Sequence, residues 1–195
     1  MKNINKFFFI FLFFLTINFS LSTKVISKES WLLDKNLSSI EFELPVLFAN
    51  NVQGKFEEIN GIIEIDLANK ENNKAIFSVK INSINMNYKK YKNLLLSDIF
   101  FDSYNFPVAL VDTKKFSYKN ENEFSLEVEL TIKGKTEIVP LDIEIIHLAN
   151  ELIQIKTDLD FSRTLFNIGT GKWQSTAILK DKGVIKTNLF LFKQE

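Results

Sequence analysis

Few residues of this 195-residue chain suit acid–base, nucleophilic or metal chemistry. The sequence contains no cysteine, which excludes disulfides, thiolate metal ligands and a cysteine nucleophile. Its single histidine, His147, rules out a two-histidine metal site or mechanism within one chain. His147 also lies close to the Ala149-Asn150 turn signal, so we expect it to be an exposed residue at the end of a strand.

The acidic residues and the glycine-rich segment are no stronger candidates for a catalytic or phosphate-binding site. Asp158 and Asp160 alternate with apolar residues, which places both carboxylates on the solvent face of one predicted strand instead of in an acid–base site. Gly169-Thr170-Gly171 resembles a phosphate-binding loop only in its glycines, because the strand and helix that such a loop requires are not predicted around it. We therefore expect a protein that is not an enzyme and that needs no metal or cofactor.

Composition favours a globular protein that does not bind nucleic acid. Lysine plus arginine and aspartate plus glutamate each number 24, whereas binding to phosphates needs an excess of cations. Hydrophobic residues make up 46% of the chain and charged residues 25%, which is typical of a folded domain. Phenylalanine is abundant, at 20 residues. An interior rich in these rings is either a filled core or one hollow enough for an apolar ligand.

Residues 1–22 have the three-part layout of a secretory signal peptide. Lys2 and Lys6 precede an unbroken apolar run at 7–15, and Ser20-Leu21-Ser22 offers small residues for cleavage. A membrane-spanning helix needs about 20 apolar residues, so this run is too short to be an anchor. We expect cleavage near Ser22, a mature domain at 23–195 and a periplasmic location.

Alternation of apolar and polar residues predicts antiparallel strands over the mature chain. Asn60-Gly61 has the composition of a type I′ hairpin turn between two of them. Sequential hairpins with one apolar face each close most simply into an eight-stranded up-and-down barrel, with a β-sandwich as the alternative. The eight or nine expected strands lie at 38–44, 52–59, 62–67, 75–82, 108–118, 123–132, 136–147, 152–161 and 184–192.

One segment, residues 88–97, has helical spacing instead. Its apolar side chains share one arc, and Lys89, Lys90 and Lys92 cover the other. Such a helix can plug one end of the barrel, and a basic amphipathic helix can also lie on a membrane surface. We expect residues 88–101 to act as the lid through which a ligand enters, with contacts from Tyr88, Tyr91, Leu95, Phe100 and Phe101.

Five elements, in order, resemble the YceI-like family of secreted polyisoprenoid-binding proteins, and the resemblance covers the chain from Trp31 to Phe192. Departures fall on polar positions: the helix lacks the histidines of many relatives, Ile99 replaces an acidic residue, and Ala177 replaces an aspartate. The five elements are Trp31-Leu32-Leu33-Asp34 with Ser39-Ile40-Glu41-Phe42, Val52-Gln53-Gly54-Lys55-Phe56 with Gly61-Ile62-Ile63-Glu64-Ile65-Asp66, Phe100-Phe101-Asp102 with Asn105-Phe106-Pro107, Leu130-Thr131-Ile132-Lys133-Gly134 with Val139-Pro140-Leu141, and Ser162-Arg163-Thr164 with Phe166-Asn167-Ile168-Gly169-Thr170-Gly171-Lys172-Trp173.

The resemblance implies an all-β, lipocalin-like barrel of eight antiparallel strands that carries a long-chain isoprenoid, such as a polyprenyl phosphate or a quinone tail. Such a chain offers only methyl and methylene surface, so an apolar lining holds it with few polar groups. The implied partners are this lipid and, transiently, a membrane surface, and a homodimer is compatible with them. By alternation, the expected lining is Phe42, Phe56, Phe77, Val79, Leu126, Val128, Ile155 and Phe161.

Two other functions remain as alternatives. An inert structural or adhesion module would have the same strands around a filled core. A hydrolase or isomerase on this scaffold is less favoured, because the chain has one histidine and no cysteine.

We further expect Trp173 and Phe166 to pack as a plug, and Arg163 to hold a carboxylate or carbonyl with its forked donors.

Overall fold

The structure is a computed structural model that describes residues 28–46, 51–66, 69, 71–117 and 122–194. The predicted signal peptide at 1–22 lies outside the described residues. The elements are β1 (Glu29–Leu33), β2 (Ser39–Leu44), β3 (Val52–Phe56), β4 (Ile59–Ile65), β5 (Asn73–Lys80), β6 (Ile84–Met86), α2 (Lys92–Leu96), β7 (Val108–Phe116), β8 (Glu123–Ile132), β9 (Lys135–Ala149), β10 (Leu152–Ser162) and β11 (Lys182–Lys193), with short 3₁₀ turns η1 (Ile81–Ser83), η2 (Lys89–Tyr91) and η3 (Gly171–Trp173).

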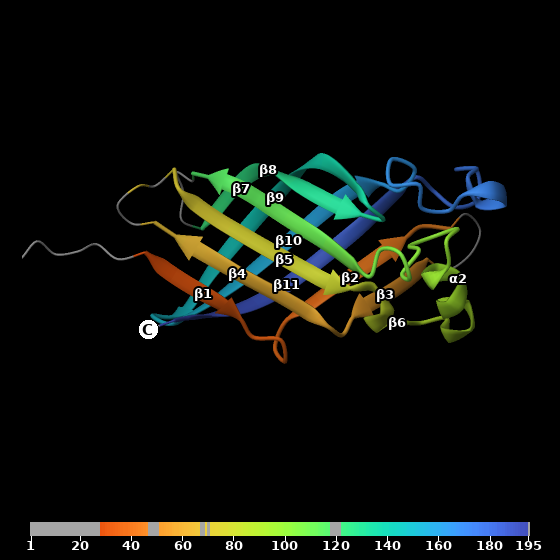
Figure 1. Cartoon of the computed structure of the whole chain (residues 1–195). Helices are drawn as coiled ribbons and strands as arrows, with labels where there is room; N and C mark the ends of the chain where they lie inside the picture. Colours follow the sequence, from red (N-terminus) through yellow and green to blue (C-terminus); the bar gives the residue numbers. More distant parts are fainter. Residues whose placement is uncertain (1–27, 47–50, 67–68, 70, 118–121, 195) are drawn as a thin grey trace, which may run out of the picture.

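The strands form a closed antiparallel barrel (Figure 1). Eight of them follow one another around it in the order β1, β4, β5, β7, β8, β9, β10 and β11, and pairing of β1 with β11 closes the ring. The predicted eight-stranded barrel with one short helical insert is therefore confirmed. None of the helices in the described part of the chain is long and apolar enough to cross a membrane.

Three of the barrel strands are broken in the middle, so that β2, β3 and β6 extend β1, β4 and β5 at one end. The first break is a turn in which Asp34 Oδ1 accepts hydrogen bonds from the backbone N–H groups of Asn36 and Leu37, at 2.8 and 3.1 Å. The second break falls at residues 57–58, and the third is the η1 turn. The prediction of a hairpin turn at Asn60-Gly61 is wrong, because both residues lie inside β4 and pair with β5.

The extended end of the barrel is closed by a cap, which we define as residues 88–107 together with residues 163–181. Within the cap, the carbonyl oxygen of Ile99 accepts hydrogen bonds from the N–H groups of Gly169 and Thr170, at 2.9 and 3.1 Å. Lys133, in the turn between β8 and β9, donates from Nζ to the carbonyl oxygens of Asp98 and Asn167. Partial burial lowers the pKa of this lysine. The two cap segments are thus tied to each other and to the barrel wall.

Arg163 organises the second cap segment. Its side chain is fully buried, with 0% of its surface exposed. Every nitrogen of the guanidinium donates to main-chain carbonyls, which confirms the predicted role of its forked donors. The acceptors, at 2.8–3.4 Å, are the carbonyl oxygens of Ile168, Gly169, Gln174, Ser175, Leu179 and Lys180.

A carboxylate near Arg163 balances its charge. Burial disfavours the charged form of Asp181, but hydrogen bonds from Ser162 and Thr164, with the attraction of Arg163, outweigh that effect and lower its pKa. Burial also lowers the pKa of Arg163, and Asp181 opposes that shift. Asp181 therefore stays ionised at neutral pH, and Arg163 stays charged because a guanidinium is not deprotonated in proteins.

We predict that Arg163→Met lowers the free energy of unfolding by more than about 3 kcal/mol, because the carbonyls that Arg163 satisfies would stay buried without a donor. Urea unfolding followed by circular dichroism measures the change. Lys182→Met is the matched control, since this lysine pairs with Asp160 on the surface, where such pairs contribute about 0–1 kcal/mol. Equal unfolding midpoints for the two variants would show that the guanidinium does not hold the cap.

Candidate functional site

The barrel encloses an elongated cavity of about 240 Å³. Glu29 and His147 line it at one end, and Phe101 and Phe161 line it at the other, beside the cap. We call the first end the mouth and define it by the start of β1 and the ends of β9 and β11, which meet near the C-terminus (Figure 1). Between the two ends the lining is mostly aliphatic and phenylalanine side chains, so the cavity suits an apolar molecule.

The structure brings together most of the residues predicted to line the interior. Leu126 and Val128 face the same interior from β8, but they pack in the wall without lining the cavity. The residues that do line it are Phe42, Phe56, Phe77, Val79, Ile155 and Phe161.

Three of these phenylalanines face a glycine on the neighbouring strand. Phe42 pairs with Gly54, Phe77 with Gly61, and Phe161 with Gly183. A Cβ atom added to Gly61 would lie 2.1 Å from the ring of Phe77. A Cβ atom added to Gly54 or Gly183 would lie 2.6 Å from the ring of Phe42 or Phe161, respectively. Each ring therefore occupies the space that a side chain on the next strand would take. Because the rings cover the wall in this way, the centre of the barrel stays open.

Polar atoms on the cavity wall are used within the protein. The Thr187 hydroxyl donates to Thr157 Oγ1 at 3.1 Å, and Thr113 Oγ1 accepts from the N–H of Ala75 at 2.9 Å. At the mouth, the ammonium of Lys193 forms an ion pair with Glu29 and lies 6.0 Å from the centre of the Trp31 ring. His147 is exposed at the end of β9, as predicted, but it also lines the cavity, which sequence reasoning missed.

A β-bulge in β7 shapes the mouth. Lys114 has a φ of +53°, and the pairing of β7 with β5 shifts at this point, so that Ile76 faces Asp112 while Lys74 faces Lys115. Thr113 faces the cavity, so regular alternation would also point Lys115 inward. The bulge instead turns Lys115 outward and Phe116 into the cavity. Phe116 then stacks on Phe124 of β8, with ring centres 6.0 Å apart and planes 13° apart.

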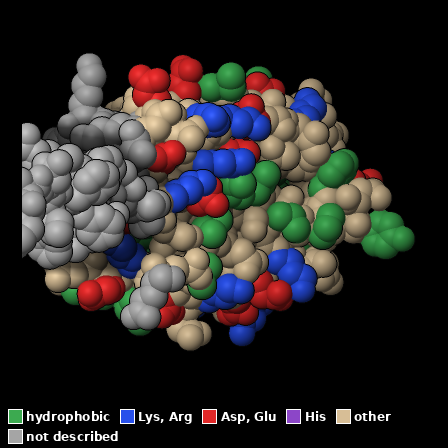
Figure 2. Space-filling model, turned by 60° about the vertical axis from the view of Figure 1, so that its left-hand side comes forward, with side chains coloured by type: hydrophobic (Ala, Val, Ile, Leu, Met, Phe, Trp, Pro, Cys, Tyr) green, Lys and Arg blue, Asp and Glu red, His purple; other side chains and the backbone are tan. Residues whose placement is uncertain are grey.

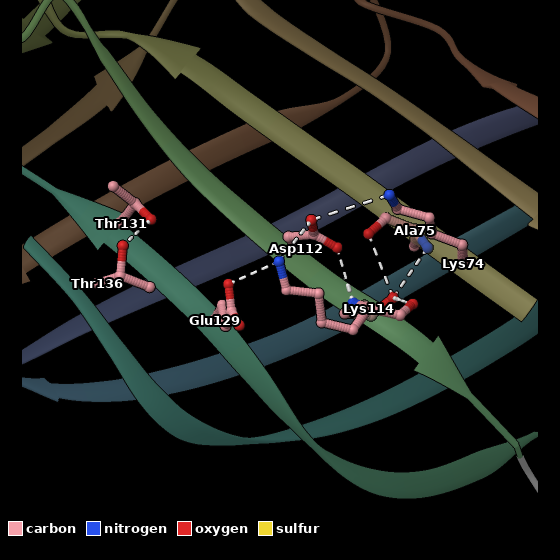
Figure 3. A network of polar contacts seen from close by, with 8 residues as sticks. Lys74, Ala75, Asp112, Lys114, Glu129, Thr131 and Thr136 are labelled. Atoms are coloured by element: carbon pink, nitrogen blue, oxygen red, sulfur yellow. Dashed lines mark hydrogen bonds and ion pairs between the residues drawn. The ribbon is translucent and has the colours of Figure 1, made fainter. Parts of the chain in front are cut away.

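Polar contacts on the outer wall hold this bulge (Figure 3). The Lys114 N–H donates to Asp112 Oδ1 at 2.7 Å, and Lys114 Nζ lies 2.8 Å from Glu129 Oε2 and 3.4 Å from Asp112 Oδ2. The hydrogen bond with Glu129 raises the pKa of Lys114. The left-handed backbone at a non-glycine residue is unfavourable by itself, and these contacts offset that cost.

The residues predicted to form a lid occupy the cap, but only Phe101 lines the cavity. Leu95 and Phe100 are each 4% exposed and belong to the core, while Tyr88 and Tyr91 pack edge-to-face nearer the surface. The helix is shorter than expected, because only Lys92–Leu96 is α-helical and a 3₁₀ turn precedes it. Its role as an entrance stays a prediction.

Phe166 and Trp173 pack within the cap without lining the cavity, as the plug interpretation expects. Phe166 is fully buried against Phe161, with ring centres 6.0 Å apart, and the ring centres of Trp173 and Phe100 are 5.9 Å apart.

The carboxylates of Asp158 and Asp160, the candidates for acid–base chemistry, are exposed on the outside of β10, as predicted. Within the described part of the chain, no group of three His, Asp or Glu side chains is placed to hold a metal ion.

We predict that Gly61→Ala weakens binding of a neutral apolar dye, N-phenyl-1-naphthylamine, by about tenfold, because the new methyl group forces the Phe77 ring into the cavity. Fluorescence titration measures the affinity. Asn60→Ala, on the exposed face of the same strand, should leave it unchanged. Equal dye affinity of Gly61→Ala and the unsubstituted protein would contradict this account of the open lumen.

Comparison with known proteins places the whole barrel in one family. The model of the YceI-like domain matches residues 31–190. A UPF0312 protein from Staphylococcus aureus is 31% identical over 107 residues, and one from Shewanella denitrificans is 26% identical over 104 residues. These alignments cover 55% and 53% of this chain and only 60% and 54% of the relatives, so the chain matches little more than half of their length.

Three solved structures have a similar fold. BcnA from Burkholderia cenocepacia superposes with a TM-score of 0.74 at 23% identity, covering 81% of this chain and 98% of BcnA. A polyisoprenoid binding domain from Saccharophagus degradans gives 0.65 at 14% identity, covering 84% and 98%. The Campylobacter jejuni YCEI protein gives 0.65 at 26% identity, covering 77% and 90%. With the family model spanning the barrel from β1 to β11, this chain belongs to the YceI-like domain family.

Proposed function

We propose that this protein binds a long-chain isoprenoid lipid inside its barrel and carries it as a periplasmic binding protein. The observation that carries the proposal is the elongated apolar cavity between mouth and cap. Each 100 Å² of isoprenoid surface buried there would contribute about 2.5 kcal/mol. The similar fold of the Saccharophagus degradans polyisoprenoid binding domain supports this choice of ligand.

The cavity favours this proposal over the two alternatives. A structural or adhesion module needs a filled core, and three Phe–Gly pairs instead keep this lumen open. An enzyme on this scaffold is less favoured, because the chain has one histidine and no cysteine. Cationic and anionic side chains are interspersed on the face shown in Figure 2, as suits a protein that does not bind nucleic acid.

The periplasmic part of the proposal rests on the signal peptide layout of residues 1–22. Transient contact with a membrane surface belongs to the same proposal, because a carrier must collect its lipid from a bilayer. The homodimer stays an expectation. N-terminal sequencing of the protein recovered from the periplasm of its host should give a start near residue 23.

We predict that the protein purified from its host releases an isoprenoid lipid on extraction with organic solvent, as identified by mass spectrometry. Ala109→Trp should reduce the lipid recovered per protein at least fivefold, because Ala109 lines the cavity and the indole would fill it. Ile138→Trp is the matched control, since Ile138 is 66% exposed on the outer wall. A lipid-free protein, or equal lipid in both variants, would overturn the proposal.

We also predict a role for the cap lysines in lipid transfer. Replacing Lys89, Lys90 and Lys92 by Gln should slow transfer from anionic vesicles several-fold at low salt, because each lysine near such a surface contributes about 1 kcal/mol. Thermal stability should stay nearly unchanged, since Lys89 and Lys90 are exposed and Lys92 is partly exposed. Transfer at the rate of the unsubstituted protein would remove these charges from the mechanism.

A further inference from the structure

The mouth differs from the rest of the cavity in its chemistry. On the wall, the side chains of Thr113, Thr157 and Thr187 already bond within the protein. At the cap end, the lining consists of apolar side chains, including Phe101 and Phe161. Charged and imidazole groups border the cavity at the mouth, where Glu29 and His147 belong to its lining. The cavity is therefore amphipathic along its length.

The buried charge of Arg163 in the cap does not alter this polarity. Arg163 is fully buried, but its donors are directed to main-chain carbonyls, and the side chain does not line the cavity. Lys133 likewise donates to carbonyl oxygens of the cap. An amphiphile would thus find hydrogen-bonding groups at the mouth and apolar contacts beside the cap.

The ion pair at the mouth is partly shielded from water. The side chain of Glu29 is 23% exposed and that of Lys193 is 35% exposed, and the ammonium also lies over the Trp31 ring. A lysine ammonium has three donors, so pairing with one carboxylate leaves donors for a ligand, and the carboxylate keeps lone pairs for a hydroxyl. His147 adds one further donor or acceptor.

Two lysines at the mouth are each paired with a carboxylate. Lys193 is neutralised by Glu29, and the nearby Lys28 is neutralised by Glu64. A phosphate or pyrophosphate head carries at least one full negative charge and would need an unpaired cation in this setting. An alcohol or carbonyl needs only hydrogen-bond partners, which an intact ion pair and an imidazole supply.

Building on the proposed lipid-binding function, we propose that the mouth is a head-group site for an uncharged, hydrogen-bonding head, an alcohol or a carbonyl, and that the isoprenoid tail points toward the cap. Lys193, Glu29 and His147 contact the head. Phe116 and Phe124 form an aromatic lip beside it, and the phenylalanine-rich wall holds the tail.

The two tryptophans of the chain provide a direct test, because Trp31 lines the cavity at the mouth and Trp173 packs in the cap. Trp173→Phe leaves Trp31 as the single emitter, and Trp31→Phe leaves Trp173. A benzoquinone with a four-isoprene tail is the probe, since its ring quenches nearby indole emission. We expect at least fivefold stronger quenching of Trp31 than of Trp173. Stronger quenching of Trp173 would show the opposite orientation.

If Trp31→Phe does not fold, the unsubstituted protein and Trp173→Phe answer the same question. Quenching at the mouth then predicts a larger fractional loss of emission in Trp173→Phe than in the unsubstituted protein. An equal or smaller loss would overturn the orientation.

A competition assay tests the charge of the head. Geranylgeraniol should displace the neutral dye at least tenfold more strongly than geranylgeranyl monophosphate. Lys193→Met should weaken binding of the alcohol at least fivefold, whereas the surface control Lys182→Met should not. Tighter binding of the phosphate, or equal affinities in the two variants, would overturn the head-group site while leaving lipid binding intact. Binding of neither C20 lipid would instead refute the proposed function.

Discussion

One buried cation determines how this barrel ends. The guanidinium of Arg163 is removed from water, and such a charge is stable only when hydrogen bonds replace its hydration. Residues 163–181 contain only one short 3₁₀ turn, so most of their carbonyl groups have no helix or sheet partner. The two requirements satisfy each other, because the loop wraps around the cation with its carbonyls pointing inward. Hydrogen bonds to one side chain thereby hold a segment without regular structure in place as part of the cap.

Because the cap closes one end of the barrel, the two ends of the cavity differ. The loop around Arg163 positions Phe166 against Phe161 of β10 and Trp173 against Phe100 of the first cap segment. The opposite end has no comparable closure among the described residues, and there the barrel carries its polar lining instead. The interior owes its volume to pairs such as Phe77 with Gly61, in which a ring takes the place of a missing side chain. The cap thus depends on hydrogen bonds to a buried cation, and the open wall depends on phenylalanine rings packed over glycines.

Much of this arrangement follows from local sequence patterns. Alternation identifies the inward faces because the side chains of a strand point alternately to its two sides, and six of the eight residues that it selects line the cavity. It cannot show that Leu126 and Val128 are covered by their neighbours, because that depends on packing across strands. Asn60-Gly61 misled the prediction because the glycine is needed for the Phe77 ring and not for a turn. Lys193 and Glu29 are far apart in sequence, so only the closure of β1 on β11 reveals their pairing.

The bulge at Lys114 has a consequence for how relatives of this chain can diverge. Because the bulge decides whether Phe116 or Lys115 faces the lumen, a strand of the same length that ran on without the bulge would carry a cation at the rim in place of the aromatic lip. Most substitutions alter one side chain at a time, whereas loss of the bulge would switch the character of the mouth in one step. Substitutions that release the outer-wall contacts of the bulge, such as the one between Asp112 and the Lys114 N–H, are therefore an evolutionary route to a different mouth on an unchanged barrel.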